Sequence, residues 1–336
     1  MTPELKRFAR QALAAVLIVA LIAAVIYAID LILLVFAGIL LAVLLRAAGT
    51  WLTAHSRVSI KWSMAIVLTG FATILFGSLW LFGVQIANQA DQLFAALSQA
   101  FSEFQQKMQQ YRVAGLLLPE ASTVNLIPSA KAAASGLLWV IASIVLILFL
   151  GLYLSTDPEL YTELFLSFFD GRLHARVAKL LEETASALRW WLLAQLIAMG
   201  IVGLITMIGL LIIGAPMAIP LGVVAALLTF VPYVGALVSA IPAILLALTK
   251  GGNMVVYVML VYLIAHVVEG YIVVPLIQHR LVYLPPAMIL ATQFLLEIFT
   301  GTLGVAFGTP LMVVAMVLIK NLYFKQDWTE EVRDVA

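Results

Sequence analysis

The sequence predicts an all-α integral membrane protein with about eight transmembrane segments. Composition is the first reason: 64% of the 336 residues are hydrophobic and 10% are charged, whereas roughly a quarter of the residues in soluble domains are charged. Patterning is the second, because apolar stretches of about 20 residues, enough to cross a bilayer, recur along the chain. The third is that polar segments with a helical pattern separate these stretches.

Eight apolar stretches follow one another along the chain. Six have a length close to that of one crossing helix: 11–29, 31–48, 62–87, 136–155, 191–214 and 253–278. The first two form one run interrupted by Asp30, so they need a very tight hairpin there or are two short helices that do not fully cross. The sixth and the eighth in chain order, 216–249 and 286–320, are longer than one straight crossing requires. Both contain several Pro and Gly residues, so we expect Pro/Gly-broken helices in segments six and eight.

Two polar helical insertions divide the chain into parts. The first, 88–135, is expected to be an extracytoplasmic amphipathic helical segment, and the second, 156–190, a cytoplasmic helical hairpin. The remaining parts are three N-terminal transmembrane segments in 1–87, a fourth in 136–155, a C-terminal transport core in 191–320 and a cytoplasmic tail in 321–336.

Each insertion carries its own helical signal. In the first, a seam of large apolar residues recurs at spacings of three and four, as on one side of an amphipathic helix: Leu97, Phe101, Phe104, Met108 and Tyr111. Such a seam can pack on the protein itself, on the bilayer surface or on another subunit. In the second, Asp157 is expected to cap a helix whose first residue is Pro158.

The distribution of Lys and Arg sets the expected orientation, because cytoplasmic loops carry the excess of these residues. With eight crossings and the N-terminus inside, 14 of the 18 Lys and Arg residues fall on the cytoplasmic side. The four on the outer side are Lys107, Arg112, Lys131 and Arg280. The sequence therefore predicts a multi-pass protein with both termini in the cytoplasm.

The stretch FVPYVGALVSAIP places Pro232, Gly235 and Pro242 inside the sixth apolar segment. Proline lacks the backbone donor that a helix needs, so a helical Pro232 would free the carbonyl of Leu228. A carbonyl freed at membrane depth is tolerated only where protein or water satisfies it. Such a carbonyl therefore needs a partner, either from other protein or from water.

The stretch FTGTLGVAFGTP places Gly301, Gly304 and Pro310 in the eighth segment. Paired interruptions of long apolar segments point to a transport site, since half-helix ends and unwound carbonyls can hold ions or polar solutes. The alternative is a pair of kinked helices that make room for their neighbours.

Ionisable residues lie inside the seventh segment. Glu269 follows His266 by three residues and Tyr262 by seven, so the three share one helix face. A carboxylate beside an imidazole can share or pass a proton, and Pro275 would free the carbonyl of Tyr271 nearby. The arrangement predicts either a proton or cation site or a satisfied polar pair that fixes helix packing.

A second polar group lies in the eighth segment. Gln293 and Glu297 are four residues apart, with Thr300 three residues further on, again on one face of a helix. These residues are candidates for ion or solute contact. Alternatively, Glu297 lies near the outer surface and is solvated.

Several functions are excluded or unsupported. The net charge of +1 offers no basic surface for nucleic acid, and the chain has no cysteine for thiol chemistry. No phosphate-binding GxxxxGK[ST] loop and no HExxH motif occur. We therefore expect no enzymatic activity, no cofactor and no metal site.

The second half of the chain resembles the autoinducer-2 exporter family, also called PerM-like permeases. The resemblance rests on IGAPMAIPLGVVAALLTFVPYVGALVSAIPAILLAL, HVVEGYIVVPLIQHRLVYLPP and GTLGVAFGTPLMVV. The positions that match the family pattern are Gly214, Pro216, Pro232, Gly235, Pro242, Glu269, Pro275, Pro285, Gly301, Gly304 and Pro310. Many members have a second proline after the glycine of the first break, where this chain has Ala236.

This resemblance implies a carrier of the bacterial inner membrane that works without ATP hydrolysis. It implies export of autoinducer-2 or another small polar metabolite, or exchange of sodium or lithium for protons, in a homo-oligomer for which a pentamer is one candidate. Our first hypothesis is a proton-coupled exporter in which Glu269 and His266 carry the proton. The second is a sodium(lithium)/proton antiporter, and the third a passive channel or oligomeric membrane scaffold.

Overall fold

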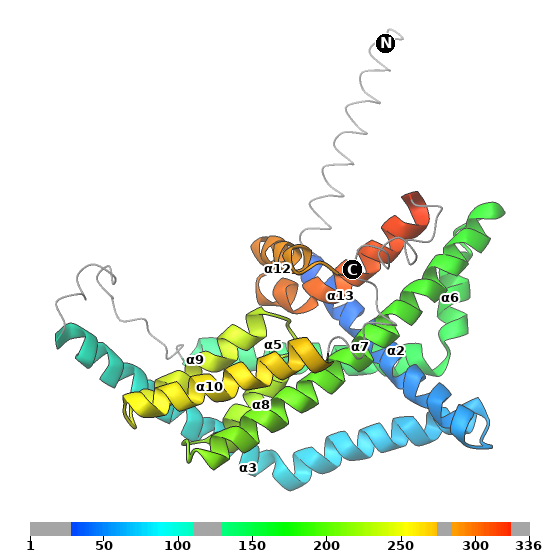
Figure 1. The fold of residues 1–336 in the computed structure, drawn as a ribbon. Coiled ribbons are helices and arrows are strands. Elements are labelled where there is room, and N and C mark those ends of the chain that lie inside the picture. The colour runs from blue at the N-terminus through cyan, green and yellow to red at the C-terminus, as the bar shows by residue number, and fades with distance from the viewer. Residues whose placement is uncertain (1–27, 111–129, 274–283, 324–336) are drawn as a thin grey trace, which may run out of the picture.

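The computed structural model describes residues 28–110, 130–273 and 284–323, and all its elements in these ranges are helices (Figure 1). Their bounds are α2 Ile29–His55, α3 Ile60–Gln110, α5 Ala130–Thr156, α6 Pro158–Leu166, α7 Arg172–Ile212, α8 Ala218–Leu228, α9 Val234–Leu248, α10 Gly252–Val268, the π-helical turn η1 Glu269–Val273, α12 Pro286–Thr300 and α13 Thr302–Tyr323. The N-terminal and C-terminal segments, 1–27 and 324–336, lie outside the description.

Five of these helices are long and apolar enough to cross a membrane, namely those that contain Ile29–His55, Leu138–Thr156, Leu173–Ile212, Gly252–Ile272 and Thr302–Asn321. Further apolar helices are shorter than the roughly 20 residues that one crossing needs. The predicted class, an all-α membrane protein, is confirmed.

Glycines let α2 and α5 approach closely. A Cβ added at Gly38 would lie 2.6 Å from Cβ of Leu150, and one at Gly151 would lie 2.6 Å from Cδ2 of Leu41. Small residues at such contacts are typical of helix pairs in membranes, because they allow the backbones to meet. Helix α2, which ends at His55, thus packs on α5, which begins only at Ala130.

Helix α3 runs without interruption through the predicted boundary at 87–88. Its 51 residues correspond to about 75 Å, well beyond the thickness of a bilayer. In its second part Leu93 is buried and Leu97 packs against the core formed by α7 to α10. That part of the predicted seam contacts the protein itself, and the side chains of the other seam residues lie outside the description.

Helix α7 is the central element of the fold. It follows the short helix α6, which begins as predicted: Asp157 accepts a hydrogen bond from the Leu160 amide and Pro158 is the first helical residue. The C-terminal part of α7 packs with α8, α9 and α10 around one apolar core, which includes Val202 and Leu210. On another side, Leu188 and Trp191 belong to a second core with α2 and α13.

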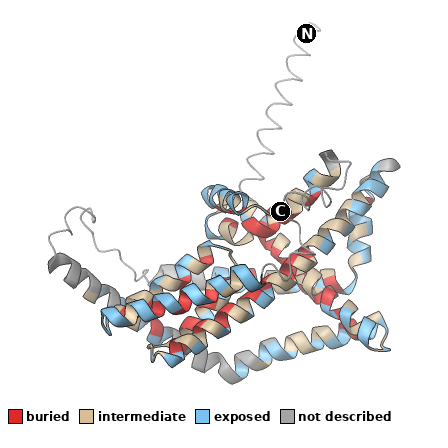
Figure 2. Ribbon diagram, viewed as in Figure 1, coloured by how far each residue is buried: buried red, intermediate tan, exposed pale blue. Residues whose placement is uncertain are grey.

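The buried residues gather where these helices meet, and the outward faces are exposed (Figure 2). Those exposed faces carry large apolar side chains, such as Trp80 at 85% and Ile212 at 79% exposure. A soluble protein would hide such residues, whereas hydrocarbon solvates them without cost. The exposed apolar surface is therefore further support for a membrane protein.

Candidate functional site

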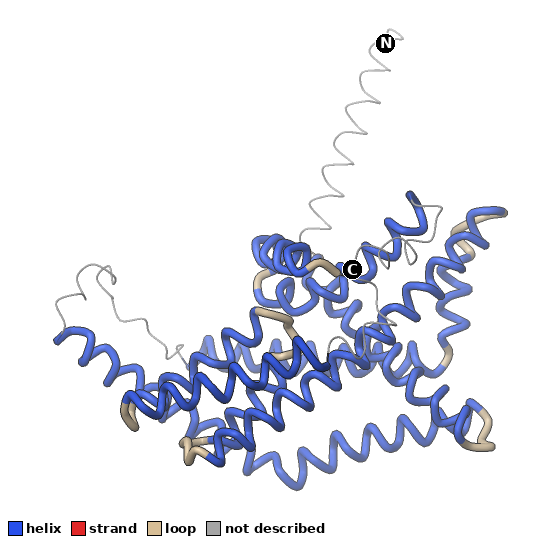
Figure 3. The backbone as a smooth tube through the Cα atoms, viewed as in Figure 1, coloured by secondary structure: helices blue, strands red, loops and turns tan. Residues whose placement is uncertain are grey.

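The sixth and eighth apolar segments are each divided, as predicted (Figure 3). In the sixth, α8 has 11 residues and α9 has 15, and a short non-helical turn at 229–233 joins them. In the eighth, α12 ends at Thr300 and α13 begins at Thr302. None of the three short helices, α8, α9 and α12, is long enough to cross a bilayer alone.

The predicted consequence of Pro232 is wrong in its detail. The residue lies outside both helices, in the turn, and the Leu228 carbonyl accepts a hydrogen bond from the Val231 amide at 2.9 Å. Because the helix has already ended at Leu228, the proline frees no carbonyl there. The carbonyls that need partners belong to the turn itself.

Two buried glutamines supply those partners from different helices. The Gln195 amide on α7 donates to the carbonyl of Thr229. The Gln293 amide on α12 donates to the carbonyl of Pro232 at 3.2 Å and to the hydroxyl of Thr309 on α13 at 3.2 Å. The break in the sixth segment is thus stabilised by side chains from outside that segment, which is one of the ways in which backbone groups at membrane depth are satisfied.

Gln195 was not among the residues predicted from the sequence. The sequence does indicate Gln195, because it is a polar residue within the apolar stretch WWLLAQLIAMG. In the structure it is buried, with 8% exposure. A polar side chain in the middle of a crossing helix generally faces other protein. Its partner, a backbone carbonyl 34 positions away, could not be read from that pattern.

We expect Gln195→Leu to destabilise the protein. Leucine has a similar volume but no donor, so the Thr229 carbonyl loses this bond at a cost of about 1–3 kcal/mol. Thermal unfolding of the purified protein in detergent measures the effect. Gln99→Leu is the matched control, because Gln99 lies on the exposed side of α3. Equal unfolding temperatures for the two variants would contradict the assigned role of Gln195.

The turn of the sixth segment has an unusual backbone. Tyr233 adopts a φ of 64°, in the left-handed region, and the next helix then passes close to the end of α8. A Cβ on Gly235 would overlap the carbonyl oxygen of Leu228. Only glycine fits this position, so the predicted importance of Gly235 has a steric explanation.

The eighth segment forms a helical hairpin, in which α12 packs along α13 (Figure 1). Gly301, with a φ of 60°, is the turn between them. A Cβ on Gly304 would overlap the hydroxyl of Thr300. The expected breaks at Gly304, Pro310 and Pro242 differ from the structure, since α13 and α9 continue through them.

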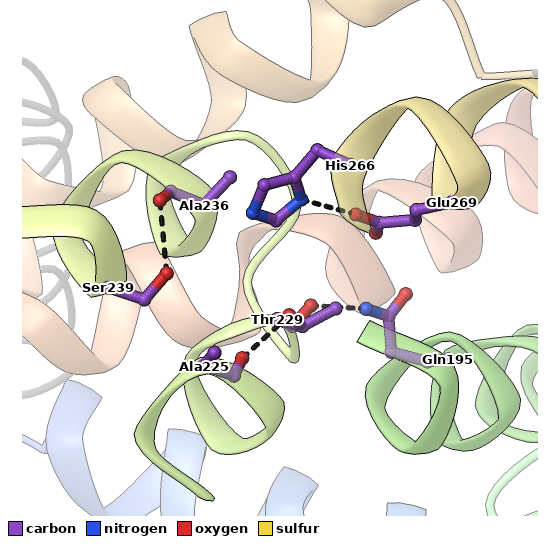
Figure 4. Close-up of polar contacts among 7 residues, drawn as sticks. All are labelled: Gln195, Ala225, Thr229, Ala236, Ser239, His266 and Glu269. Atoms are coloured by element: carbon purple, nitrogen blue, oxygen red, sulfur yellow. Dashed lines mark hydrogen bonds and ion pairs between the residues drawn. The ribbon is translucent and has the colours of Figure 1, made fainter. Parts of the chain in front are cut away.

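His266 and Glu269 form the predicted pair (Figure 4). His266 is near the end of α10, Glu269 is the first residue of η1, and Nδ1 of the imidazole lies 2.8 Å from Oε2 of the carboxylate. Their side chains are 21% and 19% exposed. Contact between η1 and α7 places the pair beside the helix that carries Gln195.

The second imidazole nitrogen is the notable feature of this pair. Nε2 of His266 is buried and has no hydrogen-bond partner. The hydroxyl of Tyr262, one turn earlier on α10, is also buried and unpaired, and the two rings lie 6.5 Å apart. Two polar atoms on one face of α10 therefore lack partners beside the hydrogen-bonded pair, where a proton or a polar group would find hydrogen-bonding capacity.

The remaining predicted residues do not join this group. Glu297 is exposed, whereas Gln293 on the same helix is 1% exposed. Pro275 lies outside the described residues. Within the described ranges, no three His, Asp or Glu side chains gather as metal ligands.

The fold and the site define a multi-pass α-helical membrane protein with two broken segments and a half-buried ionisable pair at the junction of α10 and η1. Residues 15–324 match the family model described as AI-2E family transporter. The chain belongs to the AI-2E transporter family, which confirms the resemblance found in the sequence.

Three similar proteins of Bacillus subtilis (strain 168) carry transport in their names. "Putative transport protein YueF" is 24% identical over 202 residues, which are 59% of this chain and 55% of that protein. "Putative transport protein YrrI" is 26% identical over 171 residues (51% and 48%), and "Putative transport protein YdbI" is 30% identical over 111 residues (33% and 32%). The aligned part of this chain spans about half the length of the first two relatives, and less of the third.

Proposed function

We propose that this membrane transporter is a secondary exporter that couples a small polar metabolite, such as autoinducer-2, to the movement of protons. The hydrogen bond between His266 and Glu269, at the junction of α10 and η1 and next to α7, is the observation that carries the proposal. Two half-buried titratable groups within an apolar crossing segment are costly to keep, which favours a functional role for them.

The pair has the geometry of a proton relay. In a neutral imidazole with its hydrogen on Nδ1, that N–H donates to Oε2 of Glu269 and Nε2 is a free acceptor. When Nε2 of His266 takes up a proton, the Nδ1 proton can pass to the carboxylate. The proton thus enters at one side of the ring and leaves at the other.

Exchange of sodium or lithium for protons is the second candidate function. The observation that favours it is the Oε1 atom of Gln293, a buried oxygen next to the helix break that has no donor. Oxygen atoms of amides, carbonyls and carboxylates are the usual ligands of hard cations. Under this alternative, the cation and the proton would compete for binding within one transport cycle.

Proteoliposomes with an imposed pH gradient and an internal pH-sensitive dye distinguish the two functions. If cation exchange is the function, addition of sodium or lithium collapses the gradient only in vesicles that contain the protein. If metabolite export is the function, these cations have no effect, and a gradient-driven flux of labelled autoinducer-2 appears. A protein-dependent solute flux that ignores the pH gradient would instead indicate a passive channel.

The remaining parts of the proposal concern location and assembly. We propose that the protein resides in a bacterial inner membrane with both termini in the cytoplasm, as its Lys and Arg distribution predicts. We also propose a homo-oligomer, for which the exposed apolar faces offer surface. Cross-linking in membranes, followed by sizing of the detergent-solubilised product, would measure the number of subunits.

A further inference from the structure

Close contacts at glycines hold helices together in two groups, one containing α7 and α8 and the other the α12–α13 hairpin. Between α7 and α8, a Cβ on Gly203 would lie 2.6 Å from Cβ of Ala226, and a Cβ on Gly222 would lie 2.5 Å from Cβ of Met207. In the α12–α13 hairpin, Gly304 makes the equally close approach described above. Such backbone-to-backbone packing leaves no room for sliding, so each group behaves as a rigid unit.

The two units meet at the break of the sixth segment. The hairpin packs on α7 and α2 through α13, whereas α9 packs on α8 and α10, which both pack on α7. At the break, the ring of Phe307 on α13 meets the ring of Phe230 edge to face at 6.4 Å. The hydrogen bond from Gln293 to Pro232 joins the same two units. Ring contacts tolerate small displacements, but a hydrogen bond depends strongly on direction.

The orientation of the Gln293 amide is fixed by its partners. The Pro232 carbonyl can only accept a hydrogen bond, so the nitrogen of the amide must face it. Thr309 accepts the second N–H, which ties the amide to α13 as well. A Cβ on Gly308 would lie 3.0 Å from Cγ of Gln293, so the glycine gives the side chain its room against α13.

The same geometry leaves one atom unsatisfied. Oε1 of Gln293 is buried without a donor, although the residue is 1% exposed. An unpaired buried acceptor costs free energy in this arrangement, so an arrangement that gives it a donor would recover that cost. The hydrogen bond that joins the hairpin to the break can therefore be released.

We propose that Gln293 is a positioning residue that couples the two broken segments: its amide holds the 229–233 turn against the α12–α13 hairpin, and release of this bond lets the hairpin move relative to α9. That this movement changes access to the transport site rests on the proposed function. The coupling itself does not, and it can be measured without any solute.

The test uses spin labels, which the absence of native cysteine makes selective. Leu237→Cys on α9 and Ile298→Cys on α12 place labels at positions that are 73% and 78% exposed. With Gln293 present, we expect one main distance between the labels by pulsed electron paramagnetic resonance in proteoliposomes. Gln293→Leu keeps the volume but not the bond, and should raise the fraction of a second distance by about fivefold or more.

Matched pairs and variants make the result decisive. The control pair, Leu237→Cys with Ile212→Cys on α7, lies within one unit and should keep its distance. Thr309→Val removes one acceptor of the Gln293 amide and should raise the fraction of the second distance in the first label pair, though by less. If Gln293→Leu does not fold, Thr309→Val is the variant that tests the proposal. An unchanged first pair, or equal broadening of both pairs, would overturn the proposal. Because neither a gradient nor a solute is used, its failure is separable from that of the proposed function.

Discussion

Glu269→Gln is expected to abolish proton coupling while the protein remains folded. Glutamine fills the same space and can accept a hydrogen bond from Nδ1 of His266 through its oxygen, but it cannot take up a proton. Gradient-driven transport in proteoliposomes should fall by about tenfold or more, which corresponds to only ~1.4 kcal/mol. Transport that remains should no longer depend on pH.

Glu297→Gln is the matched control for this experiment, because it makes the same change at an exposed carboxylate on α12. It should leave both the rate and its pH dependence unchanged. His266→Gln provides a second arm: it keeps a donor for Glu269 but removes the second ring nitrogen, and should also lose coupling. If Glu269→Gln transports with a normal pH profile, the pair serves packing, and the proton path lies elsewhere.

Gly235→Ala is expected to be the most destabilising glycine-to-alanine change among the described glycines. The new Cβ would overlap the Leu228 carbonyl oxygen, and a backbone atom cannot turn aside as a flexible side chain can. Overpacking costs about 1–3 kcal/mol, occasionally more, and we expect the upper end here. Thermal unfolding followed by size-exclusion chromatography in detergent should show a lower melting temperature and a smaller monodisperse fraction.

The control for this variant is Gly200→Ala on α7. No atom lies within 4 Å of a Cβ added at Gly200, and alanine is favoured over glycine within a helix by up to about 1 kcal/mol. Gly200→Ala should therefore be neutral or slightly stabilising. Equal melting temperatures for the two variants would contradict the close approach of α9 to α8 on which the geometry of the break depends.

The pair His266 and Glu269 shows what a local pattern can predict. A spacing of three residues on a helix brings two side chains to one face whatever the rest of the chain does, and the structure places these two in contact. The same reasoning fails for Gln293 and Glu297. Both belong to α12, but burial depends on what packs against each residue, and only Gln293 faces other elements.

Pro232 and Pro242 show a related limit. Proline weakens the interior of a helix, so the sequence marks both positions equally. The structure ends α8 at Leu228, before the first proline, and continues α9 through the second. The difference follows from the surroundings, because the carbonyls of the turn near Pro232 receive donors from Gln195 and Gln293.

The sequence by itself determined the membrane class, the two divided segments and the ionisable pair. Each depends on local properties: hydropathy over a crossing length, the backbone limits of Pro and Gly, and helical spacing. The tertiary structure decided how the break of the sixth segment is satisfied. The donors are Gln195 and Gln293, which lie 34 and 61 positions from their acceptors, and a bond across such distances exists only once the helices have packed.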